Sequence, residues 1–376
     1  MKTGRMRKII LSVTNDLTYD QRMHRICASL AGAGFGVELV GRLRPGSLPL
    51  SERPFRQTRL KCYFEKGKAF YLEYNLRLFF FLLRSRFDIL CAVDLDTIVP
   101  VWAAGLLKKA ALAYDAHEYF SEVPEVVGRP LIRRVWEQVA KTFIPRMDRC
   151  YTVGPALADV FGKRYGVPFE VIRNLPLRRE GPFQETAPGP PMLFYQGALN
   201  EGRGLEALIR AMSAFPEAQL WLAGEGDLSA GLRELVQSLR LEKQVRFLGF
   251  IRPEELPGLT RQATIGFNVL ENRGLSYYYS LANKAFDYIQ AGIPSVHMDF
   301  PEYRAIQERY GVFHLIPDLE RETLLNAIRK LLDDSAYCEQ LRENCRKAAV
   351  ELVWEKEEGR LLRVYKHLEE VEKLKS

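Results

Sequence analysis

Apolar and polar positions alternate along the chain between two kinds of segment. Short apolar runs, typical of buried strands, are separated by longer stretches whose apolar residues follow helical spacing. In the first half, the pattern predicts strands at 8–13, 37–42, 87–93, 111–116 and 148–154, with helices at 20–34 and 99–110. Strands that alternate with helices in this way indicate a parallel sheet covered by helices.

A second series of the same kind begins after residue 190. The predicted strands lie at 192–197, 218–224, 245–250, 265–270 and 294–298, and the helices at 204–215, 228–240, 253–262 and 280–291. Both halves are therefore predicted to be doubly wound α/β domains. Ligands of open parallel sheets bind beyond the carboxyl ends of the strands, so we expect a ligand in the crevice between the two sheets.

The stretch "LRREGPFQETAPGPP" separates the two series and is rich in Pro, Gly and polar residues, which is typical of a linker. We predict an N-terminal domain at 1–180, a linker at 181–191 with a hinge near residue 185, and a C-terminal domain at 192–354. The segment 355–376 is predicted to be a charged amphipathic helix. Its packing on the first domain stays open.

Composition places the chain among ordinary globular proteins, with 376 residues, 47% hydrophobic and 27% charged. The six cysteines show no paired spacing, so neither a disulfide framework nor a zinc site is predicted. This cysteine usage fits a reducing, cytoplasmic compartment. The longest nearly uncharged stretch is shorter than the roughly 20 residues that a membrane helix needs.

The net charge of +7 is unevenly distributed. Residues 1–190 carry 30 Lys and Arg against 19 Asp and Glu, which gives +11, whereas residues 191–376 carry 24 against 28, which gives −4. A basic half fits nucleic acid, an anionic membrane surface or an acidic substrate. Nucleic acid is disfavoured, because the basic residues are scattered and no binding module is recognised.

The stretch "YNLRLFFFLLRSRF", residues 74–87, combines apolar and basic residues. Six adjacent apolar residues surround a helix on every side, so we predict that most of them are core. The remaining face could dock on an anionic membrane surface, which requires apolar burial together with basic attraction. Peripheral attachment to the inner membrane face is therefore left open.

The segment "SLANKAFDYIQAGIPSV", residues 280–296, reads as a helix that starts near Ser280 and stops at Gly292. Lys284 and Asp287 are three residues apart and share one face of this helix. A lysine in the first turn opposes the helix dipole and therefore needs an anion. One interpretation is an ordinary salt bridge with Asp287. The other is that Lys284 and the amides at the helix start bind a phosphate, while Asp287 binds a ribose diol.

The run "NKAFDYIQAGIPSV" resembles the nucleotide-binding segment of retaining glycosyltransferases of family four. The resemblance implies the GT-B fold, in which two Rossmann-like domains face each other across a cleft. It also implies that Asp287 binds the ribose of the donor and that Lys284 and the backbone of Leu281, Ala282 and Asn283 bind the diphosphate. Tyr279 stands where many members carry a further glutamate.

Three other segments resemble the same family. "FYQGALNEGRGLEALIRAM" is similar to its glycine loop, which implies that Gly197 and Arg203 contact the diphosphate. Ala198 stands where an arginine is usual. "VRFLGFI" is similar to the segment beside the base, near Gly249 and Phe250. In "AYDAHEYFSEVPE", His117 matches a histidine near the transferred sugar or the acceptor.

Together these segments imply a transferase that moves a sugar from a nucleotide diphosphate sugar to a hydroxyl of a glycan or lipid-linked acceptor. Retention, cell-surface polysaccharide or glycolipid synthesis, and activity without a metal or a further cofactor are expected. Two alternatives remain open, a nucleotide-sugar epimerase of the same architecture and a non-catalytic nucleotide-binding homologue. Ala198 and Tyr279 keep the second one open, because usual site residues are missing there.

Two further motifs are predicted to be structural. "GEGD" at 224–227 follows a strand, but its acidic residues would repel phosphate. "DLD" at 94–96 resembles the D-x-D of metal-dependent glycosyltransferases. That motif belongs to a different fold, so we predict no metal here and expect Asp96 and Thr97 to cap the helix that begins at Ile98.

Overall fold

The computed structural model describes residues 5–178, 181, 183 and 189–375, and the chain forms two compact units. The first comprises Met1–Asn174 and Glu357–Ser376, and the second comprises Leu175–Lys356. The first unit ends before the predicted boundary at 180, since Leu175 is already buried in the core of the second unit. Most of the predicted linker, with its hinge near residue 185, lies outside the described residues.

The first unit contains a seven-stranded parallel sheet with the strand order β3-β2-β1-β4-β5-β6-β7. Its strands are β1 (Lys8–Ser12), β2 (Gly36–Leu43), β3 (Arg56–Lys61), β4 (Ile89–Val93), β5 (Ala111–Ala116), β6 (Arg149–Thr152) and β7 (Phe169–Val171). Its α-helices are α1 (Gln21–Gly32), α2 (Gly67–Arg84), α3 (Ile98–Lys108), α4 (Pro124–Val127), α5 (Pro130–Phe143), α6 (Pro155–Tyr165) and α15 (Trp354–Lys375) from Glu357 onward. The short 3-10 helices are η1 (Leu95–Thr97), η2 (Phe120–Glu122) and η3 (Ile144–Arg146).

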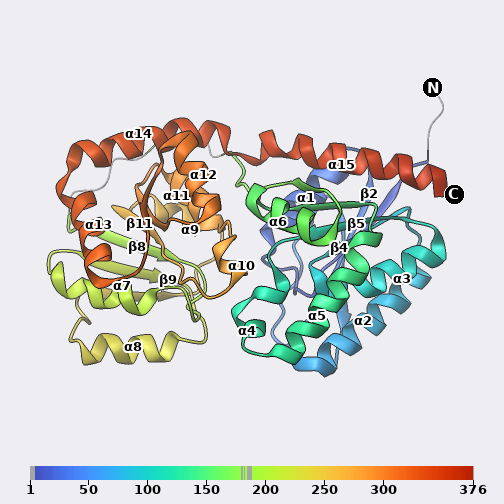
Figure 1. Ribbon diagram of the computed structural model, residues 1–376, viewed down its shortest axis with the longest axis horizontal. Helices are drawn as coiled ribbons and strands as arrows, with labels where there is room; N and C mark the ends of the chain where they lie inside the picture. The colour runs from blue at the N-terminus through green and yellow to red at the C-terminus, as the bar shows by residue number, and fades with distance from the viewer. Residues whose placement is uncertain (1–4, 179–180, 182, 184–188, 376) are drawn as a thin grey trace. The chain divides into compact units, whose positions relative to one another are not determined.

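Helices cover both faces of this sheet. α2, α3 and α5 lie along one face, and α1 and α15 lie along the other (Figure 1). The strand order reverses between β1 and β4, and every residue of β4 and β5 is buried. The loops that follow β1, β4 and β5 therefore meet at one switch point, where a doubly wound sheet offers a ligand site.

The C-terminal helix α15 packs on the first unit, a question that the sequence left open. The hydroxyl groups of Tyr365 and Tyr151 lie 3.2 Å apart in the interior. At the far end of the helix, Lys375 Nζ donates to Asp148 Oδ2 at 2.6 Å. Buried aromatic side chains and this terminal ion pair fix the helix along its length.

The second unit contains a six-stranded parallel sheet with the strand order β10-β9-β8-β11-β12-β13. Its strands are β8 (Met192–Gln196), β9 (Gln219–Ala223), β10 (Val245–Gly249), β11 (Ile265–Asn268), β12 (Ser295–Met298) and β13 (Phe313–Ile316). Its α-helices are α7 (Leu205–Ala211), α8 (Ser229–Ser238), α9 (Leu256–Thr260), α10 (Leu275–Tyr278), α11 (Asn283–Ala291), α12 (Pro301–Tyr310), α13 (Arg321–Asp333) and α14 (Ser335–Glu351), with a 3-10 turn η4 (Met212–Ala214).

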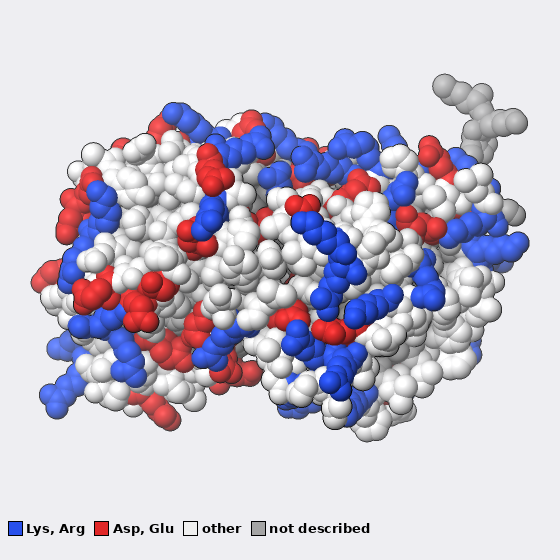
Figure 2. Space-filling view, in the orientation of Figure 1, with Lys and Arg blue, Asp and Glu red and all other residues white. Residues whose placement is uncertain are grey.

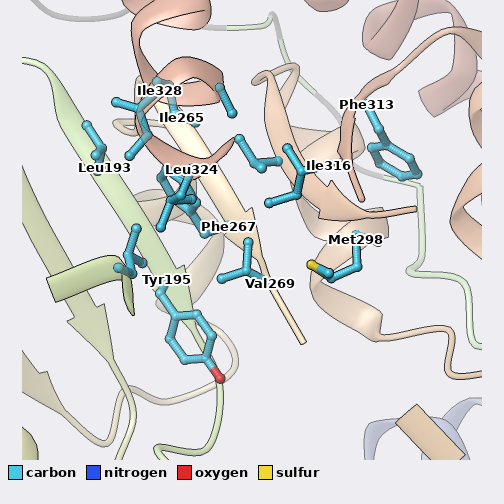
Figure 3. Close-up of a cluster of buried hydrophobic side chains, with 14 of the residues drawn as sticks. Leu193, Tyr195, Ile265, Phe267, Val269, Met298, Phe313, Ile316, Leu324 and Ile328 are labelled. Atoms are coloured by element: carbon cyan, nitrogen blue, oxygen red, sulfur yellow. The ribbon is translucent and has the colours of Figure 1, made fainter. Parts of the chain in front are cut away.

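The core of the second unit lies between its sheet and the helices. α13 packs with α7, and α7 packs with α8, while α11 contacts α9 and α14, and α14 contacts α12 (Figure 1). Figure 3 shows the apolar side chains of β8, β11, β13 and α13 gathered together, with the Tyr195 ring at the edge of the group and its hydroxyl pointing away. The apolar parts of the strands are buried in this core, and polar groups lie at the carboxyl ends of the strands.

Among the residues described, no helix is both long enough and apolar enough to cross a membrane.

Candidate active site

Three glycine turns follow neighbouring strands at the carboxyl edge of the second sheet. Gly197, Gly224 and Gly249 have φ of +131°, +150° and +69°, a region that favours glycine. The Gly224 amide donates to the Gly249 carbonyl at 2.8 Å. A Cβ at Gly224 would lie only 1.9 Å from the Gly197 carbonyl oxygen, so the turns can pack together only as glycines. "GEGD" thus has the structural role predicted for it, and Phe250 follows with 59% of its surface exposed.

Lys284 lies in the first turn of α11 and is buried. Its Nζ has no hydrogen-bond partner among the described residues, and it lies 3.7 Å from the centre of the Tyr195 ring. Burial lowers the pKa of Lys284 well below its ordinary value, and the positive charge of Arg203 lowers it further, while Asp287 opposes this shift. The salt bridge between Lys284 and Asp287, one of the two interpretations of the sequence, is absent from the described structure. An anionic ligand would supply the missing partner.

Arg203 lies in the loop after β8, between two glycines with positive φ, Gly202 and Gly204. Its guanidinium carbon lies 4.9 Å from the centre of the Tyr277 ring. Its Nε is buried and has no hydrogen-bond partner in the described part of the chain. Since the charge of Arg203 lowers the pKa of Lys284, the two cations share one electrostatic environment. The structure thus brings together the two predicted diphosphate contacts.

Aromatic rings, rather than carboxylates, support both cations. A ring attracts a cation through its quadrupole but adds no negative charge. The two rings are themselves fixed, because Tyr195 Oη donates to the Ala198 carbonyl at 2.9 Å and Tyr277 Oη donates to the Glu201 carbonyl at 3.2 Å. Each group is therefore positioned without being paired to a carboxylate of the described residues, which leaves it available to an anionic ligand.

Asp287 is half-buried on α11 and is oriented by the end of β8. The Gln196 amide donates to Asp287 Oδ2 at 2.8 Å, and Gln196 Oε1 in turn accepts from the Thr260 hydroxyl at 2.7 Å. This chain of hydrogen bonds fixes the amide orientation, so the carboxylate is held in one position. Gln196 and Thr260 are orienting residues that sequence reasoning missed.

The start of α11 differs from the prediction. The helix begins at Asn283 rather than near Ser280, because Ala282 has extended backbone angles and a separate short helix, α10, precedes it. The Ala282 amide donates to the Tyr303 hydroxyl at 3.0 Å, so one of the predicted phosphate-binding amides is already engaged. Leu281 is buried, which assigns its side chain to the core.

His117 lies in the first unit, after β5, between two carboxylates. Its Nε2 is 3.0 Å from Asp115 Oδ2, and its Nδ1 is 3.5 Å from Asp94 Oδ2. Arg22 donates to the other Asp115 oxygen at 2.8 Å. Asp94 has a φ of +55°, a rare conformation for a residue with a side chain, and its carboxylate also accepts from the His117 amide at 2.8 Å. These groups form a partly buried charge cluster at the switch point of the first sheet, in which Asp115 and Arg22 are themselves buried.

Family comparisons agree with this layout. Residues 178–349 match the family described as Glycosyl transferases group 1, and residues 19–178 match the Glycosyl transferase 4-like domain. The chain is a glycosyl transferase, and its residues 178–349 carry the group 1 domain. A relative from Methanocaldococcus jannaschii, described as an uncharacterized glycosyltransferase, is 27% identical over 167 residues. That match spans 43% of this chain and 40% of the length of the relative.

Solved structures share the fold of this glycosyl transferase. Sucrose-phosphate synthase from Thermosynechococcus elongatus has a TM-score of 0.76 at 18% identity, over 96% of this chain and 99% of that one. HepE from Anabaena, in complex with UDP-glucose, has a TM-score of 0.76 at 14% identity over 96% and 99%. WaaG, described as a glycosyltransferase of lipopolysaccharide biosynthesis, has a TM-score of 0.70 at 16% identity over 95% and 99%. The predicted GT-B fold, with two Rossmann-like units, is confirmed.

The D-x-D segment of this glycosyl transferase does not cap a helix through its side chains, so that prediction is wrong. The Thr97 hydroxyl donates back to the Val93 carbonyl at 3.0 Å, and the Asp96 carboxylate accepts from the Thr14 hydroxyl at 2.7 Å. Burial and the neighbouring Asp94 raise the pKa of Asp96 to about 7. Among the described residues, no group of three or more His, Cys, Asp or Glu side chains is arranged to hold a metal ion.

The charge state of His117 in this glycosyl transferase leads to a testable prediction. Burial alone would lower its pKa, but Asp115 and Asp94 raise the pKa of His117 from 6.5 to about 9. Because the folded-state pKa is raised, the charged histidine stabilises the fold fully below pH 6.5, and this contribution is lost as the pH rises through about 9. We expect His117→Gln to remove a pH-dependent stability on the order of 3 kcal/mol.

Urea unfolding measured across this pH window tests the prediction. The exposed histidine of α15, His367, provides the matched control, since His367→Gln should leave the pH dependence of the wild type unchanged. A His117→Gln variant with the same pH slope as the wild type would show that the two carboxylates do not hold the imidazole in its charged form.

Besides Thr260, sequence reasoning missed Tyr195, Tyr277 and Gln196 of this glycosyl transferase. Each contacts a predicted site residue that is distant in the chain, and none stands in a recognisable spacing with it. A Tyr-Gln pair at the end of a predicted strand, directly before a glycine turn, is the one local signal in the chain that could have indicated Tyr195 and Gln196.

Proposed function

We propose that this protein transfers a sugar from a nucleotide diphosphate sugar to a hydroxyl group of a glycan or lipid-linked acceptor, with retention of the anomeric configuration. The observation that carries the proposal is the buried ammonium of Lys284, which lacks a hydrogen-bond partner among the described residues and lies near Arg203. A buried charge is costly unless it is paired. A diphosphate would pair with both cations at once.

Charge separation is the difficult step of such a transfer. The bond between the anomeric carbon and the diphosphate oxygen breaks, and the electron pair leaves with the diphosphate. An ammonium about 4 Å from a phosphate oxygen attracts it by about 4 kcal/mol at an effective dielectric constant of about 20, against about 1 kcal/mol in water. Arg203 adds a planar fork that suits phosphate oxygens. Preorganised cations of this kind stabilise the departing charge.

Retention is proposed to follow from attack on the face that the diphosphate leaves. The acceptor oxygen forms the new bond to the anomeric carbon, and its proton passes to a diphosphate oxygen. This route needs no nucleophilic side chain, no metal ion and no further cofactor. Both ring nitrogens of His117 face carboxylates. Its proposed contribution is therefore a positive charge beside the sugar or the acceptor rather than proton abstraction.

The nucleoside is proposed to lie over the glycine turns of the second sheet. Asp287, oriented by Gln196, would accept hydrogen bonds from the ribose hydroxyls, and Gly249 and Phe250 would lie beside the base. The structures of HepE described with UDP and UDP-glucose are consistent with a nucleotide-sugar donor for this fold. We further propose a role in cell-surface polysaccharide or glycolipid synthesis at the cytoplasmic side of the membrane.

A donor screen tests the proposed function directly. The full chain is mixed with uridine, guanosine and adenosine diphosphate sugars, and thermal unfolding identifies the donor that stabilises it. Release of nucleoside diphosphate is then followed with and without hydroxyl acceptors, and NMR of the product reports the anomeric configuration. If no nucleotide sugar stabilises the protein and none is consumed, the proposal fails. Isomerised donor without an acceptor would instead indicate an epimerase.

Asp287→Ala is expected to weaken nucleoside diphosphate binding by roughly 10- to 100-fold, the range for lost hydrogen bonds to a charged group. The loss should be specific to the nucleoside, because the carboxylate is assigned to the ribose. Calorimetry should therefore show weakened binding of the nucleoside diphosphate and unweakened binding of inorganic pyrophosphate.

Asp333→Ala supplies the matched control for Asp287→Ala. Asp333 is an exposed aspartate on α13 of the same unit, and its loss should leave the binding of both ligands unchanged. Equal weakening of nucleoside diphosphate and pyrophosphate by Asp287→Ala would contradict the ribose assignment and point to a general effect on the pocket.

A further inference from the structure

The helix α2 is apolar on both of its faces. The core side consists of side chains at every fourth position, Phe70, Tyr74, Leu78 and Leu82. On the opposite side, Leu72 is 65% exposed, and Leu76 and Phe80 are each 50% exposed. A displacement of two residues turns a helix by about 200°, so this second stripe points away from the core. Of the six adjacent apolar residues 78–83, only Leu78 and Leu82 are buried, so the prediction that most of them are core is wrong.

The apolar surface continues from α2 onto two neighbouring helices. α3 packs against α2 and exposes Leu106 at 62%, and α5 packs against α3 and exposes Leu131 at 75% and Val135 at 61%. Edge-on ring contacts link the helices, since Trp136 of α5 touches Tyr71 of α2. We name this surface the apolar face, defined by Leu72, Leu76, Phe80, Leu106, Leu131 and Val135. Isolated exposed apolar residues are common, but a connected group across three helices is not.

The exposed charges on the three helices of the apolar face all have one sign. Figure 2 shows a broad uncharged area over α2 and α3, with Lys and Arg side chains along its border. The exposed charged residues of these three helices are basic: Lys68, Arg84, Lys108, Arg134 and Lys141.

Two acidic residues occur on these helices, and both are less exposed and already paired. Glu73 bonds Arg77 at 2.7 Å, and Glu137 lies 3.2 Å from Arg164. Their side chains are 13% and 23% exposed. Neither acid therefore offsets the positive potential of the exposed lysines and arginines.

We infer that the apolar face docks on the surface of an anionic lipid bilayer. Surface-bound helices need apolar side chains to enter the acyl boundary and basic side chains to meet the headgroups, and the apolar face supplies both. A second copy of the chain is disfavoured as the occupant, because a symmetric contact would bring the same cations together. No described helix can cross a membrane, which agrees with attachment from one side.

The inference rests on the apolar face alone and not on the chemistry of the candidate active site. It deepens the proposed function in one respect, because an enzyme docked on the membrane would encounter lipid-linked acceptors by diffusion within the membrane plane. Vesicle binding is measured without donor or acceptor. A failure of the proposed reaction therefore leaves this test intact, and a failure to bind vesicles leaves the reaction proposal intact.

Co-sedimentation of the full chain with vesicles tests the inference. One set is phosphatidylcholine with about 30% phosphatidylglycerol, and the other is phosphatidylcholine alone. We expect binding to the anionic vesicles, much weaker binding to the neutral ones, and release by about 0.5 M NaCl. The double variant Leu72→Ser, Leu76→Ser should lower the partition coefficient at least about tenfold. Arg134→Gln and Lys141→Gln should each lower it about fivefold.

Matched controls come from α14 of the second unit. Val350→Ser changes an apolar side chain that is 47% exposed, and Lys347→Gln changes a lysine that is 72% exposed. Neither should alter vesicle binding. Circular dichroism and thermal unfolding check that every variant is folded, which is expected because the substituted side chains are exposed.

Three outcomes would overturn the inference. Folded wild-type protein could fail to bind anionic vesicles, or it could bind neutral and anionic vesicles equally. Light scattering could also reveal a dimer that Leu72→Ser, Leu76→Ser dissociates while vesicle binding is unchanged. The last result would assign the apolar face to a second copy of the chain.

Discussion

Arg203→Ala is expected to lower the turnover of sugar transfer by about 100-fold or more, the range found when one preorganised electrostatic stabiliser is removed. The guanidinium lies over the Tyr277 ring, and its Nε lacks a hydrogen-bond partner among the described residues. Removing the side chain should thus cost the fold little stability. The thermal unfolding temperature should therefore change little. Steady-state kinetics with saturating donor measures the effect.

Two further variants separate the charge of Arg203 from its geometry. Arg203→Lys keeps the charge but loses the planar fork, so its turnover should fall between those of the wild type and Arg203→Ala. Arg210→Ala removes an exposed arginine of α7 in the same unit and should leave turnover unchanged. If Arg203→Ala retains wild-type turnover, Arg203 has no part in stabilising the leaving group.

The aromatic support of the cations explains why neither is paired with a carboxylate of the described residues before a ligand arrives. A carboxylate within reach of Arg203 or Lys284 would pair with it and compete with the diphosphate. The rings of Tyr277 and Tyr195 hold the same positions without that competition. In the free protein Arg203 therefore disfavours the charged form of Lys284, and a dianionic ligand would offset this repulsion.

Much of the fold follows from sequence because both sheets are parallel and buried. Such strands read as continuous apolar runs, and helices must lie between them, so the two series predicted two doubly wound units. The first and last residues of the helices and strands were harder to predict. The start of α11 depends on the backbone angles of Ala282 and on its hydrogen bond to Tyr303, which is remote in the chain.

The candidate site was predictable where the signal is local. Lys284 and Asp287 share a helix, and Arg203 stands in a glycine loop. The partners of these residues were not predictable, because the Tyr195 ring and the Gln196 amide reach them only through the packing of β8 against α11. Thr97 and Asp96 misled for the same reason, since they bond Ser12 and Thr14, which are remote in the chain, rather than the helix that they precede.

Lys284→Met is expected to lower turnover by about 100-fold or more and, at the same time, to make the protein more stable. Methionine keeps the length and apolar character of the lysine stem but removes the buried ammonium. Replacing buried charges by apolar side chains of similar size is often stabilising by about 1–4 kcal/mol. A residue that weakens the fold but strengthens catalysis fits a functional site better than a structural one.

Lys284 should also make the stability of the wild type depend on pH. The pKa of Lys284 is depressed below its ordinary value of 10.5 in the folded protein, so between the two values the unfolded chain binds more protons. Stability of the wild type should therefore rise with pH towards about 10.5, and it should be lost as the pH falls towards the depressed pKa. The Lys284→Met variant should lack this rise.

Nucleotide binding should follow the opposite trend in the wild type. Arg203 and Asp287 are the charged groups that influence the pKa of Lys284, and a bound diphosphate would add negative charge beside it. Its pKa would rise on binding, so the protein would take up a proton, and affinity should fall as the pH rises through the depressed pKa of the free protein. Calorimetry in two buffers of different ionisation enthalpy measures this uptake.

Lys347→Met, which removes an exposed lysine of α14, is the control and should behave like the wild type in every assay. Proton uptake that persists in Lys284→Met would have to come from another group. Turnover that survives the substitution would show that the diphosphate does not depend on this ammonium. A variant that is more stable, slower and free of the proton uptake would link the cost of the buried charge to the reaction, since one atom, Nζ, accounts for all three changes.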